Sequence, residues 1–175
     1  IKENFMPGDF VKYTVTTTPD FNEFKLAVSG GTVLLKNGVV QEFTHNIKGL
    51  HPRTAAGSTA DGRYLLLVTV DGRQNASIGM TQEELAELML QLGASDAINF
   101  DGGGSTTMTV RRPGKENPEV VNRPSDGSPR KIINALGLFS TAPGGSLKGL
   151  LIETADTNIF VNTSREFHVR GYDEN

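Results

Sequence analysis

The sequence predicts an α+β or mixed α/β fold, with a mixed β-sheet and packed helices followed by the start of a β-sandwich module. Short runs of β-branched and apolar residues, separated by turn residues, recur along the chain and are typical of strands. One segment between them, residues 81–93, has helical periodicity with a marked beginning and end. The composition, 37% hydrophobic and 21% charged over 175 residues, is that of an ordinary folded domain.

The first part of the chain is expected to form strands. Residues 10–16, Phe-Val-Lys-Tyr-Thr-Val-Thr, alternate apolar and polar side chains. Residues 32–40 hold two apolar runs around Asn37-Gly38, a dipeptide that strongly favours a two-residue hairpin turn. Residues 64–70 are almost continuously apolar, so we expect a strand buried on both faces in the middle of the sheet.

A helix is predicted to follow. Thr81 and Glu84 have the spacing of a capping box, which satisfies two backbone donors at a helix start. Four apolar side chains then share one helix face, and Gly93 supplies a left-handed stop. The four are Leu85, Leu88, Met89 and Leu92. Residues 94–100 read as the next strand, so the order strand, helix, strand predicts a parallel crossover in the sheet.

The end of the chain is expected to begin a second unit. Residues 132–139 are predicted to be one more buried strand, and residues 141–146 a linker. Three later apolar runs predict the first strands of a β-sandwich module, namely 150–152, 159–161 and 167–170. The predicted domains are therefore 1–141, lacking its N-terminal part, and 142–175. The opening Ile1-Lys2-Glu3-Asn4 suggests a fragment or a processed product, since it has neither an initiator Met nor a signal peptide.

Composition excludes several classes of function. The net charge of -3, with both signs interspersed, argues against a nucleic-acid surface, which needs clustered Lys and Arg. The absence of cysteine excludes disulfides, thiolate metal sites and a Cys nucleophile. No apolar run approaches the roughly 18 residues that span a bilayer. No His or Cys cluster has metal-ligand spacing, so no cofactor is predicted, although a site of carboxylates alone stays open.

The most informative stretch is a triglycine segment directly after the predicted strand 94–100. It consists of Asp101, Gly102, Gly103, Gly104, Ser105 and Thr106. Each glycine forfeits about 0.5–1 kcal/mol relative to alanine, which something must offset. Successive backbone N–H groups can hold anionic oxygens, the two hydroxyls add donors, and the aspartate adds a carboxylate. A tight turn against a neighbouring strand explains the same residues equally well, and the segment matches neither a Walker loop nor a dinucleotide fingerprint.

Other polar residues near predicted turns are candidates for the same site. Proline holds the backbone just before Arg53, whose guanidinium suits bidentate capture of a phosphate, while His51 could act as a general acid or base. Asp71 and Arg73 follow the predicted strand 64–70 and would line the same mouth as Asp101. A surface arginine, a structural histidine and a solvated turn are the alternatives.

Several motifs in a fixed order resemble those of the phosphodiester glycosidase family. They are Gly30-Gly31 with Leu34-Leu35 and Asn37-Gly38; His51-Pro52-Arg53-Thr54-Ala55; Val70-Asp71-Gly72-Arg73; Gly79-Met80-Thr81 with Glu84-Leu85-Ala86; Leu92-Gly93-Ala94; residues 97–107; and Asn122-Arg123-Pro124-Ser125-Asp126-Gly127 with Arg130. The resemblance covers residues 28–139, and several motifs in order are more specific than any one of them.

The resemblance implies a mixed α/β domain in an exported protein, secreted or on a bacterial cell surface. It also implies hydrolysis of the bond between an anomeric sugar carbon and a phosphodiester oxygen. The implied substrate is a glycosyl phosphodiester, such as an N-acetylglucosamine 1-phosphodiester or a cell-surface polysaccharide. The family further implies an Asn-Gly-Gly-Phe-Phe type segment before residue 1, which a separate N-terminal fragment of the same domain would supply as a partner.

The resemblance assigns positions to individual residues. Those that match the family pattern are Arg53, Thr54, Asp71, Arg73, Asp101, Gly102, Gly103, Gly104, Ser105 and Arg130. In the resulting hypothesis the arginines clamp the phosphate, and the glycine N–H groups with Ser105 or Thr106 position it. Asp101 is the first choice, and Asp71 the second, to activate water or stabilise an oxocarbenium-like sugar.

A different class of function fits the second predicted unit. The chain would then be a non-catalytic module that binds a cell-surface glycan or teichoic acid. Such a module needs aromatic platforms, yet the chain has no tryptophan and 3 tyrosines, so the sequence favours the hydrolase.

Overall fold

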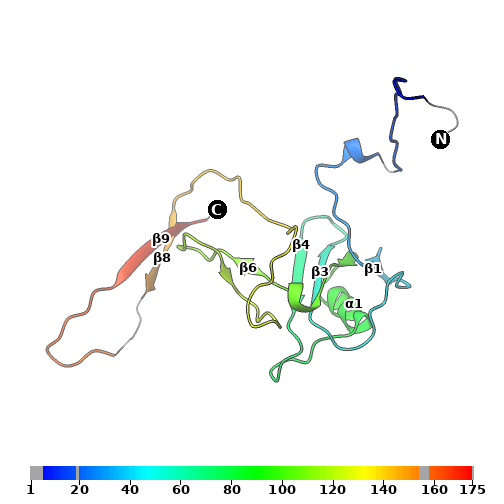
Figure 1. Cartoon of the computed structure of the whole chain (residues 1–175). Coiled ribbons are helices and arrows are strands. Elements are labelled where there is room, and N and C mark those ends of the chain that lie inside the picture. The colour runs from blue at the N-terminus through cyan, green and yellow to red at the C-terminus, as the bar shows by residue number, and fades with distance from the viewer. Residues whose placement is uncertain (1–5, 19, 154–157, 175) are drawn as a thin grey trace.

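The centre of the molecule is a five-stranded antiparallel sheet with one α-helix packed on it (Figure 1). This computed structural model describes residues 6–18, 20–153 and 158–174. The sheet contains β1 (Thr32–Lys36), β2 (Val39–Val40), β3 (Arg53–Ser58), β4 (Leu65–Val70) and β5 (Asp96–Asn99), in the order β2-β1-β5-β3-β4. The helix is α1 (Gln82–Gln91). The fold is therefore mostly β, and the predicted mixed sheet with several helices is wrong.

The predicted crossover is present, but its two strands do not pair. β4 and β5 each pair antiparallel with β3, so they run in the same direction, and α1 connects them. Because β3 lies between them, all strand pairs of the described residues are antiparallel. A crossover fixes the direction of two strands but does not make them neighbours.

The interior of the sheet is formed by β1, β5 and β3, with β5 in the middle, and the apolar strand β4 is not among them. β4 lies at the sheet edge and is only partly buried, so the expectation of a strand buried on both faces is wrong. β3 can lie between β4 and β5 and against α1 because most of its side chains are small. A Cβ on Gly57 would lie 2.8 Å from Met89 Cε and 2.7 Å from the Asp96 carbonyl oxygen. The missing side chain lets α1 and β5 approach this closely.

The predicted hairpin and helix are confirmed. β1 and β2 pair around Asn37 and Gly38, whose φ angles of 51° and 75° are those of a type I′ turn. The Thr81 hydroxyl accepts from the Glu84 N–H, and the Glu84 carboxylate accepts from the Thr81 N–H, which completes the capping box. Gly93 follows the helix with φ of 91°. Both elements are specified by residues within a few positions of one another.

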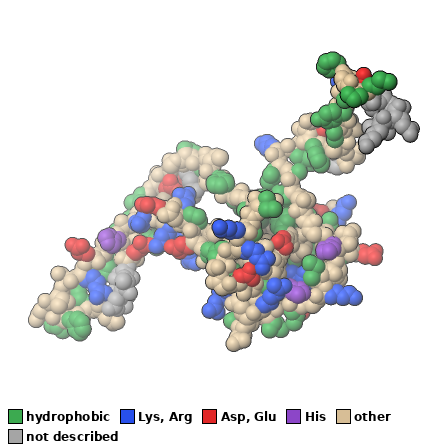
Figure 2. Space-filling view, in the orientation of Figure 1, with side chains coloured by type: hydrophobic (Ala, Val, Ile, Leu, Met, Phe, Trp, Pro, Cys, Tyr) green, Lys and Arg blue, Asp and Glu red, His purple; other side chains and the backbone are tan. Residues whose placement is uncertain are grey.

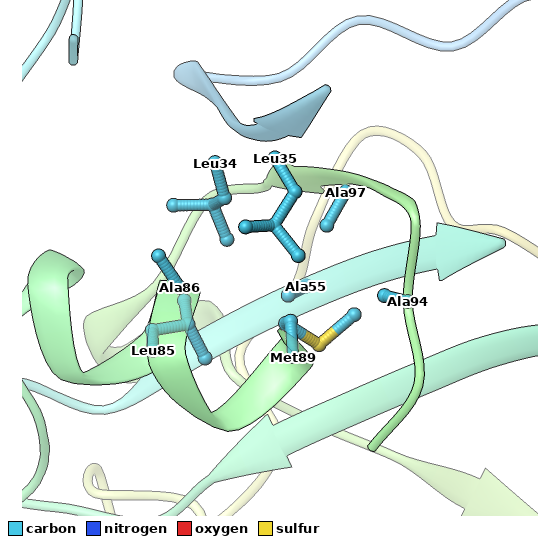
Figure 3. Packing of buried hydrophobic residues seen from close by; sticks show 8 residues of the cluster. All are labelled: Leu34, Leu35, Ala55, Leu85, Ala86, Met89, Ala94 and Ala97. Carbon is cyan, nitrogen blue, oxygen red and sulfur yellow. The ribbon is translucent and has the colours of Figure 1, made fainter. Parts of the chain in front are cut away.

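The core is the layer between α1 and the sheet, shown in Figure 3. It consists of Leu34, Leu35, Ala55, Leu85, Ala86, Met89, Ala94 and Ala97. Burying apolar surface contributes about 25 cal/mol per Å², so this layer holds α1 against β1, β3 and β5. This packing therefore fixes the positions of the strands and of the residues at their ends.

Two predicted strands are absent. Residues 6–31 contain a short 3-10 turn, η1 (Phe21–Glu23), and no strand among the described positions, and Phe10 is fully exposed. Residues 132–139 are likewise extended without pairing, and Ile133 is fully exposed. Alternation favours a strand only where a neighbouring strand can pair with it, and in Figure 1 the N-terminal segment leads away from the sheet.

Two small hairpins complete the described chain. β6 (Thr109–Val110) pairs with β7 (Glu119–Val120), and β8 (Leu147–Glu153) with β9 (His168–Asp173). The strand expected at residues 159–161 is absent, since a turn begins there. The β-sandwich module and the boundary at residue 141 stay predictions, because two strands do not make a sandwich.

Ion pairs join the two hairpins. Lys115, in the loop between β6 and β7, pairs with Glu153 of β8, and Arg170 of β9 pairs with Glu116 at 3.3 Å. Figure 1 shows these hairpins beside one another and apart from the five-stranded sheet. In residues 6–18, 20–153 and 158–174, no helix combines the length and apolar character needed to cross a membrane.

Candidate active site

A cavity of about 470 Å³ lies where β5 ends and the triglycine segment begins. Most of the predicted site residues line it, although they come from distant parts of the sequence. They are His51, Arg53, Arg73, Asp101, Gly102, Gly103, Gly104 and Arg130. We call this space the arginine cavity. Figure 2 shows basic, acidic and histidine side chains interspersed over the visible face of the sheet domain, with no broad patch of one sign.

Each of the three glycines lets a different segment approach the bend. A Cβ on Gly102 would lie 2.6 Å from the Pro52 carbonyl oxygen, and one on Gly104 would overlap Asp126 and Arg130. Gly103 has φ of 60° and begins a short 3-10 turn, η2 (Gly103–Ser105). Close packing around the bend offsets the conformational cost of the glycines.

The bend offers a ligand fewer N–H groups than the sequence suggests. The Gly102 N–H donates to the Asp101 carboxylate at 2.9 Å, and the Gly103 N–H donates to the Pro52 carbonyl at 2.9 Å. The N–H groups of Ser105 and Thr106 donate to carbonyls within the bend. Four of the six N–H groups of residues 101–106 are therefore already bonded within the described protein, which leaves those of Asp101 and Gly104 for a ligand.

Arg53, the first residue of β3, is buried and already bonded. Its Nε donates to the Met80 carbonyl at 2.9 Å, and its Nη2 donates to the carbonyls of Ile47 and Gly49 at 2.8 and 3.0 Å. Burial lowers the pKa of its guanidinium, and the charge of Glu83 opposes that shift. Arg53 therefore holds the loop 47–49 in place, and Nη1 is the nitrogen for which the described residues supply no acceptor.

Arg73 and His51 form a pair at the rim of the cavity. Arg73 follows β4 with φ of 58°, and its Nη2 lies 3.2 Å from His51 Nδ1. The other ring nitrogen, Nε2, lies 3.0 Å from the Lys48 carbonyl oxygen. The tautomer protonated at Nε2 satisfies both contacts. His51 must therefore release one partner before it can transfer a proton to or from a substrate.

Arg130 lies on the opposite side of the bend, beside Gly104. Its Nε and Nη2 donate to the Asp126 carboxylate at 2.9 and 2.7 Å. Both side chains are partly exposed, so the pair is worth about 0–1 kcal/mol. Such a weak pair leaves Arg130 able to exchange part of this contact for an anionic ligand.

Asp71 lies outside the lining of the arginine cavity. Its carboxylate accepts from Asn122 Nδ2 at 2.9 Å and from the Arg123 N–H at 3.0 Å. Asn122 in turn accepts from the Met108 N–H at 2.8 Å. Asp71 therefore ties the loop 122–123 to the end of β4, and its catalytic role stays a prediction without a contact to the cavity.

The remaining predicted residues lie near a second cavity of about 720 Å³ on the other side of Asp101. Thr54 and Ser105 line it, together with apolar residues of 27–28 and 132–136. Thr54 also donates to the Thr106 hydroxyl at 3.2 Å, and Thr106 is fully buried. Three residues border both cavities: Ser29, Phe100 and Asp101. Asp101 thus lies on the ridge between a cationic and a largely apolar space.

Two lining residues, His45 and Asn99, were assigned no role from the sequence, although Asn99 falls within residues 97–107, which resemble the family. His45 belongs to a segment that the Gln82 side chain holds through the His45 carbonyl and the Ile47 N–H. Asn99 is 6% exposed, and its Oδ1 is buried without a hydrogen bond. The available signal was a polar residue between Ile98 and Phe100 in the predicted strand 94–100. In the part of the chain that the structure describes, no group of three or more His, Asp or Glu side chains could hold a metal ion.

Known proteins resemble this chain in sequence. The family model described as phosphodiester glycosidase matches residues 5–139. The SPbeta prophage-derived uncharacterized protein YomE of Bacillus subtilis is 40% identical over 91 residues, 52% of this chain and 13% of that protein. The N-acetylglucosamine-1-phosphodiester alpha-N-acetylglucosaminidase of Bos taurus is 32% identical over 121 residues, 60% of this chain and 21% of that protein.

One solved structure among those similar to this chain is the catalytic domain of the zebrafish N-acetylglucosamine-1-phosphodiester alpha-N-acetylglucosaminidase, auto-inhibited by its pro-peptide. It is 28% identical, with a TM-score of 0.45, over 60% of this chain and 39% of that chain. The chain spans only 13% and 21% of the length of the two curated relatives. The similarity is therefore distant and partial.

Proposed function

Since the chain belongs to the phosphodiester glycosidase family, we propose that it hydrolyses the sugar–phosphate bond of a glycosyl phosphodiester. One observation carries the proposal. The Asp101 carboxylate and the guanidiniums of Arg73 and Arg130 come from three distant segments, and they line one cavity around the triglycine bend. A carboxylate next to fixed cations is what separation of a cationic sugar from an anionic leaving group requires.

In this proposal the arginines hold the phosphate. Arg73 and Arg130 present guanidiniums on two sides of the bend, and the Gly104 N–H donates between them. Arg53 stabilises the site indirectly, because its hydrogen bonds to the carbonyls of Ile47 and Gly49 hold the loop 47–49 in place. Negative charge grows on the departing phosphate as the bond breaks, so donors that are already in place stabilise the transition state more than the ground state.

Asp101 acts on the sugar in the same proposal. The Gly102 N–H donates to its Oδ1, which orients the carboxylate on the ridge between the two cavities. Water adds to the anomeric carbon, the bond from that carbon to the phosphodiester oxygen breaks, and the water proton passes to Asp101. The products are a free sugar and a phosphate monoester. A phosphate monoester is a good leaving group, so no general acid has to protonate it.

The finer parts of the proposal rest on the resemblance. The bovine and zebrafish relatives are named for an N-acetylglucosamine 1-phosphodiester, which is the first substrate to test here, followed by phosphodiester-linked polysaccharides of the cell surface. We place the enzyme outside the cytoplasm as part of the same proposal. We also propose that residues 1–141 carry the reaction, completed by an N-terminal fragment of the same domain, and that residues 142–175 begin a separate module.

The test is an assay with the methyl phosphodiester of α-N-acetylglucosamine 1-phosphate. Asp101→Asn keeps the shape of the side chain and removes its charge, so kcat should fall about 100-fold or more. Asp61→Asn removes a charge from an exposed turn outside the cavity and serves as the matched control. Wild-type turnover in Asp101→Asn would exclude the role of Asp101. Binding of the substrate without any turnover by the wild type would instead support the glycan-binding alternative.

A further inference from the structure

The side chain of Asn99 is buried at the end of the central strand β5 without a hydrogen bond. Asn99 pairs with Thr32 of β1 and with Ala55 of β3, so strands flank it on both sides. Its side chain shares a sheet face with Ala97, two residues earlier, which packs in the core beneath α1. A side chain in this position is usually apolar, and a carboxamide there requires a reason.

The carboxamide of Asn99 has no partner within the described protein. Its Oδ1 is fully buried and accepts no hydrogen bond, and its Nδ2 donates none to a described residue. The nearby Gly31 offers no side chain that could supply one. Buried polar groups in folded proteins are nearly always satisfied, and an exception calls for an explanation. A ligand that completes the hydrogen bond is such an explanation.

The ligand would reach Asn99 through the arginine cavity. Because Oδ1 is buried from solvent, the carboxamide must turn over to present it to the cavity. Asn99 forms part of its lining, only two residues before Asp101 on the same strand end. Phosphodiester oxygens carry no proton, so the phosphate held by Arg73 and Arg130 cannot donate to Oδ1. The sugar can, because its hydroxyl and acetamido N–H groups are donors. The part of the substrate next to Asn99 is therefore the sugar.

We propose that Asn99 is a specificity-determining residue whose carboxamide accepts a hydrogen bond from a sugar O–H or N–H. This inference rests on the proposed function and refines it. The floor of the cavity, at Asn99, selects the sugar, while the rim, at Arg73 and Arg130, binds the phosphate. Asp101 lines the same cavity, and in the proposed function it acts at the bond between the sugar and the phosphate. Asn99 does not bind the phosphate, and Arg73 and Arg130 do not select the sugar, so mutations can separate the two tasks.

Calorimetric titration of the chain with three probes tests this separation. The probes are inorganic phosphate, α-glucose 1-phosphate and α-N-acetylglucosamine 1-phosphate. The wild type should bind the sugar phosphates about tenfold or more tighter than inorganic phosphate, and Asn99→Leu should abolish that advantage. Asn99→Asp keeps an acceptor and should retain it. A loss confined to the N-acetyl sugar identifies the amide N–H as donor, and an equal loss for both sugars identifies a hydroxyl.

Controls separate this inference from the proposed function. Arg73→Gln should weaken all three probes alike, and Asn75→Leu, in an exposed turn, should weaken none. An unchanged sugar advantage in Asn99→Leu would overturn the inference. So would a wild type that binds phosphate with no gain from the sugar, a result that leaves the phosphate site intact. If no probe binds the wild type, the phosphate site and the inference both fail.

A second measurement does not depend on the folding of Asn99→Leu. The side-chain amide signals of Asn99 in the wild type can be assigned by NMR, because they disappear in Asn99→Asp. They should shift when either sugar phosphate is added and stay in place with inorganic phosphate. Asn99 side-chain signals that do not shift when a sugar phosphate is added would overturn the inference.

Discussion

Buried side chains lie near both ends of β5, but the two ends differ in how far their buried polar groups are satisfied. At the start of the strand, Ala94 and Ala97 close the core beneath α1. At its end, the Asn99 side chain is buried without a hydrogen bond, and Asp101, two residues later, lines two cavities. An unpaired buried polar group costs about 1–3 kcal/mol, so the end of the strand gives up stability that its start supplies. The difference assigns stability to the start and ligand binding to the end.

The largest predicted effect is on stability, at the start of β5. Met89 is fully buried against Ala94 and β3, so Met89→Ala should lower the free energy of unfolding by about 2–5 kcal/mol in urea denaturation. Leu90→Ala, on the exposed side of the same helix, is the control and should cost far less. Activity per folded molecule should be unchanged in both. A specific activity that falls with stability would show that the two ends are not separate.

The next effect is on activity, at the end of β5. Arg130 lies beside Gly104 and is held by one partly exposed carboxylate, so Arg130→Gln should lower kcat/KM by about 10-fold to 100-fold. Its unfolding free energy should stay within about 0.5 kcal/mol of the wild type. Arg63→Gln, at the exposed turn before β4, is the matched control. Equal kcat/KM in the two variants would remove Arg130 from the site.

A smaller effect is expected at the start of α1. Thr81→Ala removes the hydroxyl that accepts from the Glu84 N–H and should cost about 1 kcal/mol of stability. Thr81→Ser keeps the acceptor and should restore most of it. The melting temperatures of the two variants measure this difference. If Thr81→Ala lowered substrate affinity at unchanged stability, the helix start would belong to the site and not to the scaffold.

The smallest effect lies outside both ends of β5, in the β8–β9 hairpin. The hydrogen bond and the charge of Lys115 lower the pKa of the Glu153 carboxyl, with smaller contributions from Arg170 and His168. The ionised form is therefore favoured in the folded state, and its contribution is lost as the pH falls below the ordinary value of 4.5. Glu153→Gln should shift the β8 amide signals more at about pH 7 than at about pH 3. Equal shifts at both pH values would contradict the pairing.

The parts of the fold that the sequence predicts are those determined by near neighbours along the chain. The turn at Asn37-Gly38 and the capping box of α1 each depend on residues at most three positions apart. The order of the strands depends on partners far away, so the most apolar run, β4, was wrongly placed in the middle. Residues 10–16 and 132–139 have strand-like patterns but no paired neighbour.

The sequence predicted most of the residues that line the candidate site but not the hydrogen bonds that they make. Asp101 and Arg73 were expected together at the ends of predicted strands and Arg130 from the resemblance, and all three line the cavity. The hydrogen bonds of Arg53 to the carbonyls of residues 47 and 49 could not be predicted, since they depend on a loop whose sequence has no regular pattern. Nor could the sequence show that Asn99 lacks a partner, because an unsatisfied group is recognised only when its surroundings are known.

The site hypothesis is tested most directly by the bond that breaks. The methyl phosphodiester of α-N-acetylglucosamine 1-phosphate can be hydrolysed in water enriched in oxygen-18, and the products followed by phosphorus NMR. If water attacks the anomeric carbon beside Asp101, methyl phosphate forms and carries no oxygen-18. Label in the phosphate, or release of N-acetylglucosamine 1-phosphate, would mean attack at phosphorus and would contradict the proposed reaction.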